Sequence, residues 1–577
     1  MVPKVTTAKK DAAMRRIAYF SMEIGAHSDI PTYSGGLGVL AGDTIRSAAD
    51  LEIPMVAVTL CYDKGYFFQI INGDGHQVEH EIRWDFSDAF ELLPSVIELE
   101  IQGKTVKVGA WKYEVHGESG WTIPVYLLDT DIEGNEQWQR NFTHVLYDST
   151  PFQRIVQEVI LGIGGAKLLD KLGYKNLTTY HMNEGHAAFL TLYLYNKYKE
   201  NQKLVRDKTI FTTHTPVAAG HDQFDYSLVY DVLQDQVPQE IKDFAGEDKL
   251  NMTKLAISMS RYINGVSMKH GEVSNVMFPG AKIDYITNGV HTRFWTNPHL
   301  TKLFDNFETD EIPRTASFFE KVWKVDSDDL WRTHRKAKFD LLDYEKSNHY
   351  VLMDHNVLTI GFARRFTGYK RATLIFSDLE RLAKISQKKI QFLFAGKAHP
   401  RDEWGKSLIK NINDHSEYLW NSYRIKVAFL ENYDMDLSKL MISGCDIWLN
   451  NPVRYREASG TSGMKATHNG VLNLSILDGW WIEGYKMDPL AGWAIGVAPG
   501  EPGCDVNDDA LEASNIYKLL ENDIVPTYYK KRQDWINRMR HAIALGSYFN
   551  THRMIREYAE KAYNLMEQAR WASKNFL

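Results

Sequence analysis

Short apolar runs alternate with helix-length segments along most of the chain, which is the pattern of an α/β protein. In the first half, strands are predicted at residues 17–25 (running into a loop), 55–58, 125–128, 177–183 and 209–213. In the second half, they are predicted at residues 357–363, 390–395, 425–430 and 446–449. Parallel strands need a crossover helix to bring the chain back to the same edge. The pattern therefore predicts a parallel sheet in each half.

One buried helix is predicted at residues 152–172. Its apolar positions recur at helical spacing and are Ile155, Val156, Val159, Ile160 and Ile163. Its glycines, Gly162, Gly164 and Gly165, are expected to let a neighbouring element approach closely.

The order of the elements predicts the domain organisation. A chain of 577 residues is too long for one core, and a helical stretch at residues 300–350 separates the two α/β halves. We expect two Rossmann-like doubly wound domains facing a cleft, at residues 1–290 and 291–545, and a helical segment at 546–577 that packs back on the first domain. In that last segment, the residues expected to face a core are Tyr563, Met566 and Trp571.

Composition narrows the classes of function. The net charge is −7 and no basic patch stands out, which argues against nucleic-acid binding. Cys61, Cys445 and Cys504 are scattered, so neither a disulfide framework nor a zinc motif is predicted, and no metal site is expected. Residues 1–16 are charged rather than apolar, and no run of about 18 apolar residues exists to cross a bilayer. A cytoplasmic protein without a membrane partner is expected.

The most informative stretch is residues 457–465, Glu-Ala-Ser-Gly-Thr-Ser-Gly-Met-Lys. Small residues let the backbone approach a ligand, and the free N–H groups at a helix start attract anions. A lysine one turn into the helix can act as a point charge on a phosphate or form a Schiff base. By itself the stretch is equally compatible with a Gly/Ser surface loop and a solvated lysine.

Other polar residues follow predicted strands. Residues 36–41 satisfy the G-x-G-x-x-G/A pattern, but no acidic ribose partner is evident, so this is a close-approach loop rather than a nicotinamide site. His186 and His214 follow two consecutive strands. A lone histidine is more often structural, but two at the ends of consecutive strands favour a site. Residues 364–371 carry four cations after a strand, an arrangement that suits phosphates. The alternative there is a solvated basic turn.

Together these segments resemble the α-glucan (glycogen, starch, maltodextrin) phosphorylases, and the shorter prokaryotic members in particular. The resemblance runs in family order through the six segments 35–38, 183–186, 214–215, 285–291, 364–371 and 429–433, and ends in 457–465. It covers most of the chain. It implies the glycosyltransferase B-type fold, pyridoxal 5'-phosphate as cofactor, and a homodimer as the family expectation.

The resemblance also implies a role for each matching residue. Lys465 would carry pyridoxal phosphate as a Schiff base. The cofactor-binding set is completed by Arg364, the backbone N–H groups of Thr461 and Ser462, and Gly36, whose backbone also faces the substrate phosphate. Four residues are assigned to catalysis. Arg365 and Lys370 would bind the substrate phosphate, and His214 and Glu457 would bind the transferred glucose. The set assigned to substrate binding is Asn288, Ser459, Gly460 and Tyr369.

The sequence departs from the family pattern in four places. Ser462-Gly463 stands for the more usual Gly-Asn, Arg364 for a lysine, and Val39 for an arginine. Residues 366–368, Phe-Thr-Gly, replace a bulkier and more polar sequence.

The implied reaction is reversible, retaining phosphorolysis of an α-1,4-glucan by inorganic phosphate to α-glucose 1-phosphate. The cofactor phosphate would act as an acid/base relay, with Arg364, Arg365 and Lys370 offsetting repulsion between two phosphates. Two alternatives remain open. One is a nucleotide-sugar α-glucan synthase of the same fold, and the other is a catalytically silent glucan-binding or regulatory protein.

Overall fold

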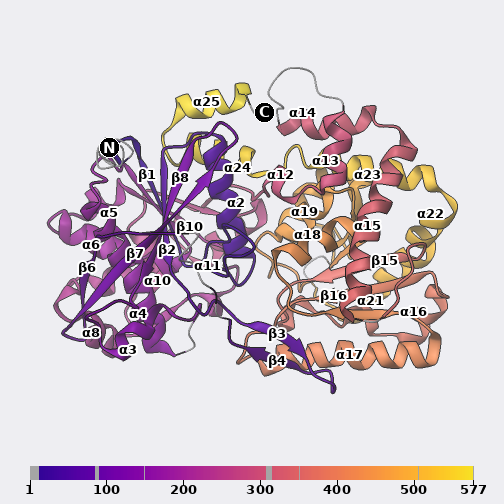
Figure 1. The fold of residues 1–577 in the computed structure, drawn as a ribbon, viewed down its shortest axis with the longest axis horizontal. Coiled ribbons are helices and arrows are strands. Elements are labelled where there is room, and N and C mark those ends of the chain that lie inside the picture. The colour runs from indigo at the N-terminus through magenta and orange to yellow at the C-terminus, as the bar shows by residue number, and fades with distance from the viewer. Residues whose placement is uncertain are drawn as a thin grey trace.

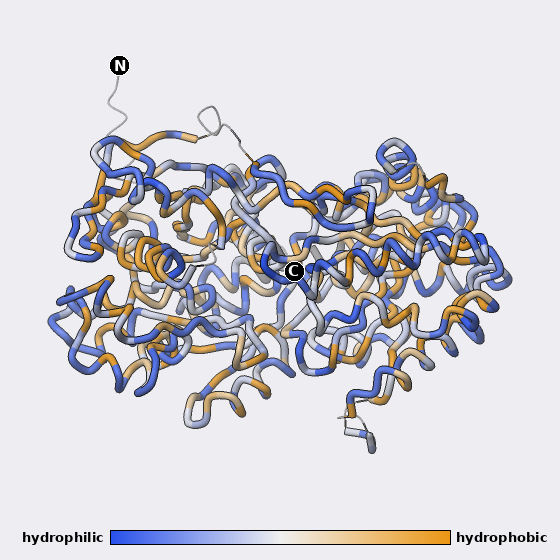
Figure 2. The backbone as a smooth tube through the Cα atoms, turned by 90° about the horizontal axis from the view of Figure 1, so that it is seen from below, coloured by the Kyte–Doolittle hydropathy of each residue, from blue (hydrophilic) through white to orange (hydrophobic). Residues whose placement is uncertain are grey.

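The computed structural model describes residues 12–82, 84, 90–147, 150–306, 315–349, 351–498, 500–503 and 506–575. Cys504 lies outside them. The N-terminal and C-terminal halves of the chain lie side by side, and the C-terminal helices return to the N-terminal half (Figure 1). Hydrophobic stretches recur inside both halves, and hydrophilic stretches follow much of the periphery (Figure 2).

The sheet of the first half has the order β14-β13-β10-β9-β1-β2-β8-β7-β5, with β6 paired to β7. Its strands are β1 (Ile17–Ser21), β2 (Met55–Leu60), β5 (Glu91–Leu92), β6 (Ile97–Ile101), β7 (Lys104–His116), β8 (Thr122–Asp129), β9 (Thr179–Asn183), β10 (Thr209–Thr212), β13 (Tyr262–Gly265) and β14 (Asp284–Tyr285). The strands from β14 to β8 are parallel, and the added edge of β5, β6 and β7 is antiparallel. The five strands predicted in this half are confirmed, whereas the antiparallel edge was not predicted.

The sheet of the second half is entirely parallel, with the order β17-β16-β15-β18-β19-β20. Its strands are β15 (Leu358–Ala363), β16 (Ile390–Ala395), β17 (Val427–Leu430), β18 (Ile447–Asn450), β19 (Leu472–Ile476) and β20 (Gly492–Ile495). Numbered from its own first strand, this is the 3-2-1-4-5-6 order of a Rossmann fold. The strands β8-β2-β1-β9-β10-β13 repeat the same order in the first half.

Both faces of the first sheet are covered by other elements. Side chains alternate between the faces of a strand, and in β1 the pair Ile17 and Tyr19 belongs to one hydrophobic cluster while Ala18 and Phe20 belong to another. A third cluster forms the core of the second half. The predicted class, two doubly wound α/β halves, is therefore confirmed. The exact domain boundaries remain a prediction.

Helices supply the remaining layers. Those of the first half are α2 (Gly36–Asp50), α3 (Gln137–Arg140), α4 (Pro151–Val159), α5 (Gly165–Lys171), α6 (Leu190–Lys197), α7 (Gln202–Arg206), α8 (Tyr226–Leu233), α9 (Ile241–Ala245), α10 (Met252–Ser258) and α11 (Met268–Met277). The next are α12 (Thr292–Trp295), α13 (Pro298–Asp305), α14 (Thr315–Glu320), α15 (Ser327–His349), α16 (Leu379–Ser386), α17 (Glu403–Tyr423) and α18 (Met435–Gly444). The last are α19 (Thr461–His468), α20 (Trp480–Met487), α21 (Asp509–Leu519), α22 (Val525–Lys530), α23 (Arg532–Leu545), α24 (Thr551–Lys561) and α25 (Met566–Asn575).

The helix predicted at residues 152–172 is confirmed as α4 and α5, joined by a π-helical turn at Ile160–Gly164. Its glycines allow the expected close packing. A Cβ added to Gly165 would lie 2.7 Å from Phe20 Cε1, and one added to Gly162 would lie 2.5 Å from the backbone N of Leu190.

The C-terminal helices contact the first half. Ile555 and Tyr558 of α24 share a core cluster with residues of α2 and β1, and Tyr563 is buried there. The prediction was wrong for Met566 and Trp571, which are 50% and 37% exposed. The reason is that Ala569, a small residue, provides the buried face of α25.

A hairpin of β3 (Phe68–Ile71) and β4 (Gln77–His80) reaches from the first half beneath the second (Figure 1). Gln69 Nε2 donates to the Gly396 carbonyl at 2.9 Å, and Gln77 exchanges hydrogen bonds with the backbone of Ala398 at 2.9 and 3.0 Å. A second small ribbon pairs β11 (Gln223–Asp225) with β12 (Lys249–Asn251). No described helix combines the length and the hydrophobicity that a bilayer span requires.

Candidate functional site

Most of the predicted site residues follow the strands where each sheet reverses its order, while His214 follows β10 and Asn288 follows β14. In open α/β sheets, ligands bind beyond the carboxyl ends of the strands at this point. The reversal lies between β1 and β9 in the first sheet and between β15 and β18 in the second. The chain leaves β1 towards Gly36 and β15 towards Arg364, while it leaves β18 towards Glu457.

Glu457 is the centre of the charged cluster in the second half. Its Oε2 atom lies 2.5 Å from Arg364 Nη2 and 2.5 Å from Lys370 Nζ, and all three side chains are 9% exposed. Burial alone would raise the pKa of Glu457, but the two cations outweigh it and lower that pKa to about 2. Glu457 is therefore a carboxylate at neutral pH.

Arg364 connects the loop after β15 to the end of β18, the two strands between which the second sheet reverses its order. Besides Glu457, it donates to Asn450 Oδ1 at the end of β18, while its Nε atom is buried without a hydrogen-bond partner among the described residues. Lys370 Nζ lies 4.5 Å from the ring centre of Tyr369. Arg365 is exposed, and within the described residues it forms no ion pair. It is thus the cation of this loop that remains available to an anion.

The loop after β18 turns into helix α19 at Gly460. Gly460 is the N-cap and has φ +84°, a left-handed conformation that glycine adopts without strain. Thr461 and Ser462 occupy the first helical positions, whose N–H groups have no intrahelical partner. The Ser462 hydroxyl already accepts from Trp448 Nε1 at 3.1 Å. The Ser459 hydroxyl is buried and has no hydrogen-bond partner in the described part of the chain.

Lys465 lies in the buried first turns of α19 and is 6% exposed. Its Nζ atom lies 3.5 Å from the ring centre of Trp295, and it has no hydrogen-bond partner among the described residues. Burial lowers the pKa of Lys465 to about 8, although the nearby carboxylate of Asp43 acts in the opposite direction. A lowered pKa leaves more of the amine neutral, and the neutral amine is the form that attacks a carbonyl carbon.

The first half contributes a loop held by Glu23. The backbone N–H groups of Ser34 and Gly35 donate to Glu23 Oε2 at 2.6 and 3.2 Å, and Tyr147 donates to Oε1 at 2.7 Å. A Cβ added to Gly38 would lie 2.7 Å from Glu23 Oε2, so glycine is required there. Gly36 then begins α2, and a Cβ there would meet no atom within 4 Å.

His214 and Asn288 also lie in the first half. His214 Nε2 is 2.7 Å from Asn183 Oδ1, and the His214 N–H donates to Glu184 Oε2 at 2.7 Å. Burial lowers the pKa of His214 to about 4, so the imidazole is neutral at pH 7. Asn288 is buried, and its carbonyl accepts from Arg553 Nη2 at 2.9 Å.

The structure brings Arg364, Lys370 and Glu457 into direct contact. Among the described residues, neither His214 nor Asn288 has a hydrogen bond to the loop 457–465. That loop is instead tied to the first half by Ser267, whose hydroxyl donates to the Ala458 carbonyl at 2.6 Å.

Sequence reasoning missed several residues that shape the site: Asp43, Trp295, Ser267 and Glu23. Two of them had a visible signal. Asp43 is an acidic residue in the mainly apolar helix that follows the glycine loop, and Trp295 follows the turn at residues 285–291 in a polar segment.

Two family models match the chain. The carbohydrate phosphorylase model matches residues 189–486, which include most of the site residues. The starch synthase catalytic domain model matches residues 16–280, the first half.

Relatives match nearly the whole chain. It is 40% identical to the maltodextrin phosphorylase of Thermococcus litoralis over 95% of this chain and 70% of the relative. It is 37% identical to the glycogen phosphorylase of Mycobacterium bovis, again over 95% and 70%, and 34% identical to the glycogen phosphorylase of Aquifex aeolicus, over 96% and 87%. The two parallel sheets agree with the glycosyltransferase B-type fold expected from the sequence. The chain belongs to the carbohydrate phosphorylase family.

Proposed function

We propose that the protein is an α-1,4-glucan phosphorylase, which uses inorganic phosphate to release the non-reducing-end glucose as α-glucose 1-phosphate with retention. The observation that carries the proposal is Lys465, a buried amine without a hydrogen-bond partner in the described residues, on the helix that follows the loop of Glu457, whose carboxylate pairs with Arg364 and Lys370. A nucleotide-sugar transferase has no need for a buried lysine at this place.

The residues around Lys465 fit pyridoxal 5'-phosphate. Buried polar groups are normally hydrogen-bonded, so the orphaned Ser459 hydroxyl and Arg364 Nε support the presence of a polar ligand. Lys465 would hold the cofactor covalently, and Arg364 with the N–H groups of Thr461 and Ser462 would hold its phosphate. When bound, the group would supply a phosphate that exchanges a proton with the substrate phosphate.

The protein's own groups have separate tasks in this proposal. Arg365 and Lys370, with the Gly36 backbone, hold the substrate phosphate and offset its charge. Glu457, ionised at neutral pH, accepts hydrogen bonds from the hydroxyls of the transferred glucose and does not itself donate a proton. Ser459, Gly460, Asn288 and His214 complete the glucose site, and Tyr369 lies against sugar and phosphate.

A nucleotide-sugar α-glucan synthase is the second candidate, because the starch synthase model matches residues 16–280. The experiment that separates the two measures phosphate-dependent release of glucose 1-phosphate from maltooligosaccharides and glycogen. It also measures the absorbance of the purified protein above about 300 nm, where a polypeptide without a cofactor absorbs very little. Release with a bound chromophore supports the phosphorylase. Glucosyl transfer from a nucleotide sugar without a chromophore supports the synthase, and no activity in either assay supports a silent glucan-binding protein.

The partners follow from the same proposal. They are an α-1,4-glucan and inorganic phosphate in one direction, and a shortened glucan and glucose 1-phosphate in the other. The homodimer and the cytoplasmic location remain predictions. Light scattering after size-exclusion chromatography tests the first of these.

A further inference from the structure

Helix α2 carries two buried carboxylates, and both bond to residues of α12 or to its N-cap residue, His291. Asp43 Oδ2 accepts from Trp295 Nε1 at 2.7 Å and from the His291 N–H at 3.2 Å. Asp43 Oδ1 accepts from Arg46 at 3.0 Å. Asp43 is 1% exposed, so these bonds are made away from water, where they are strong.

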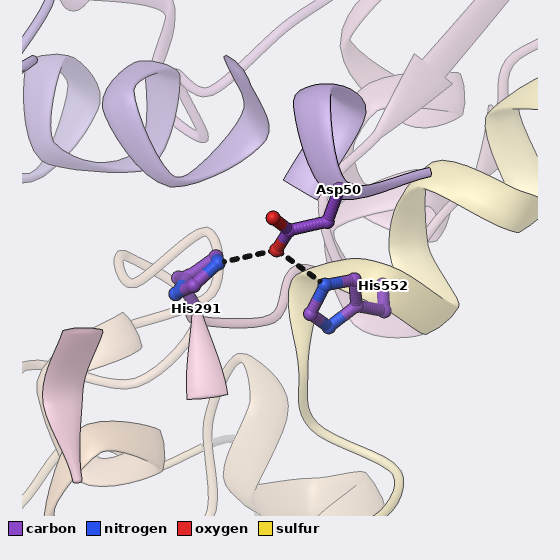
Figure 3. A group of neighbouring side chains, drawn as sticks. All are labelled: Asp50, His291 and His552. Carbon is purple, nitrogen blue, oxygen red and sulfur yellow. Dashed lines mark hydrogen bonds and ion pairs between the residues drawn. The ribbon is translucent and has the colours of Figure 1, made fainter. Parts of the chain in front are cut away.

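The second carboxylate, Asp50, fixes the start of the same helix. Its side chain lies between those of His291 and His552 (Figure 3). The Oδ2 atom of Asp50 is 2.9 Å from His291 Nε2 and 2.8 Å from His552 Nε2. These three groups come close enough to hold a metal ion. However, His291 Nδ1 accepts the Phe294 N–H at 3.2 Å, so the proton of a neutral His291 is on Nε2 and points at Asp50. In this tautomer His291 Nε2–H donates a hydrogen bond to Asp50, so Nε2 has no lone pair to offer a metal ion.

The indole of Trp295 connects these contacts of α2 to the proposed cofactor site. One edge of the ring is held by Asp43, and its face lies 3.5 Å from Lys465 Nζ. A cation over an indole face is attracted to the ring. Because Lys465 has no hydrogen bond among the described residues, the plane of Trp295 is the main contact that orients its amine.

We propose that Asp43 is a positioning residue for Lys465, which it serves by fixing the indole plane of Trp295 under the amine. Asp43 touches neither the amine nor any expected substrate. It lies two turns into α2, and Gly36, at the start of that helix, is expected to face the substrate phosphate. One helix therefore orients both the phosphate loop and the lysine. The inference rests on the proposed function for the identity of the group that Lys465 holds.

Two variants test the inference in the purified protein with its bound cofactor. Asp43→Asn keeps an acceptor of the same shape and loses the charge, while Trp295→Phe keeps a ring and loses the N–H donor. Ser47→Ala is the matched control, since Ser47 is buried one turn further along α2 and bonds to Thr551 at 2.6 Å rather than to Trp295. The readouts are cofactor content per chain, the absorbance maximum, and the rate at which hydroxylamine removes the cofactor.

We expect Asp43→Asn and Trp295→Phe to lose the cofactor about tenfold faster than wild type, the scale of one hydrogen bond to a charged group. Their absorbance maxima should shift, and kcat should fall while the KM for glucan stays unchanged. Ser47→Ala should match wild type. Equal release rates and unshifted spectra in both folded variants, checked by thermal melting, would overturn the inference. A wild-type protein that contains no pyridoxal phosphate would instead overturn the proposed cofactor.

Discussion

Lys370 Nζ and Glu457 Oε2 lie 2.5 Å apart although 87 residues separate them in the chain. The contact joins the loop after β15 to the loop after β18, across the point where the sheet reverses its order. Arg364 binds the same oxygen, so one carboxylate holds two of the cations that are expected to face phosphate. The site is therefore electrostatically preorganised within the protein, since the carboxylate keeps both cations in place before an anion arrives.

Replacing Lys465 tests the central proposal. Lys465→Ala should be isolated without pyridoxal phosphate and without measurable glucan phosphorolysis, because the covalent anchor is gone. Absorbance and glucose 1-phosphate release check this. Lys203→Ala, an exposed lysine on α7, is the control and should behave as wild type. A Lys465→Ala protein that retains the cofactor and full activity would show that the lysine has another role.

Replacing Arg365 tests the assignment of the substrate phosphate. Arg365→Ala should raise the KM for inorganic phosphate by about 10- to 100-fold, the scale of a lost hydrogen bond to a charged group. The bound cofactor should remain, since Arg364 is assigned to its phosphate. Initial rates at varied phosphate measure the effect, and Arg206→Ala on exposed α7 serves as control. An unchanged phosphate KM removes Arg365 from this role.

Replacing Glu457 tests whether it acts as a hydrogen-bond acceptor or as an acid that gives up a proton during the reaction. Glu457→Gln should lower kcat by about 10- to 100-fold. The amide oxygen accepts weaker hydrogen bonds from the sugar hydroxyls than a carboxylate does, and the substitution leaves Arg364 and Lys370 without a counter-charge. Since the pKa of Glu457 is about 2, the shape of the pH–rate profile between pH 5 and 8 should be the same in the variant. Loss of one limb of that profile would contradict the assignment. Glu403→Gln on the surface is the control.

The buried histidine His181 predicts how stability depends on pH. Its ring nitrogens bond to Tyr563 and Thr212, and burial lowers its pKa to about 3. In the unfolded chain the pKa of a histidine is about 6.5. Below that pH the unfolded chain binds a proton on His181 and the folded protein does not, so the free energy of unfolding falls as the pH falls towards 3. His181 should contribute about 2 kcal/mol of this loss between pH 6.5 and 5.

Urea unfolding of wild type and His181→Gln at both pH values measures this difference. The gap in stability between the two proteins should narrow as the pH falls. The exposed His27→Gln variant should parallel wild type. A gap that stays constant from pH 6.5 to 5 would contradict the predicted titration.

Local pattern in the sequence was enough for most strands of the two parallel sheets and for the loops that follow them, although β13 and β20 were not predicted. Apolar runs, glycines and polar strand ends are properties of neighbouring residues, so the loops around Gly36, Arg364 and Glu457 could be placed from the sequence alone. The antiparallel edge of β5, β6 and β7 was not predicted, because short strands between turns give a weak periodic signal.

The contacts inside the site depended on the tertiary structure. Glu457 meets Lys370 only because β18 lies beside β15, and Trp295 lies under Lys465 only because α2, α12 and α19 pack together. No local pattern contains the order of strands in a sheet or the partner of a helix face, since both are set by burial over the whole chain. The sequence by itself thus predicted which residues carry the chemistry. The strand order of the second sheet decided which of them touch, and the packing of α2 against α12 and α19 placed Asp43 and Trp295 beside the lysine.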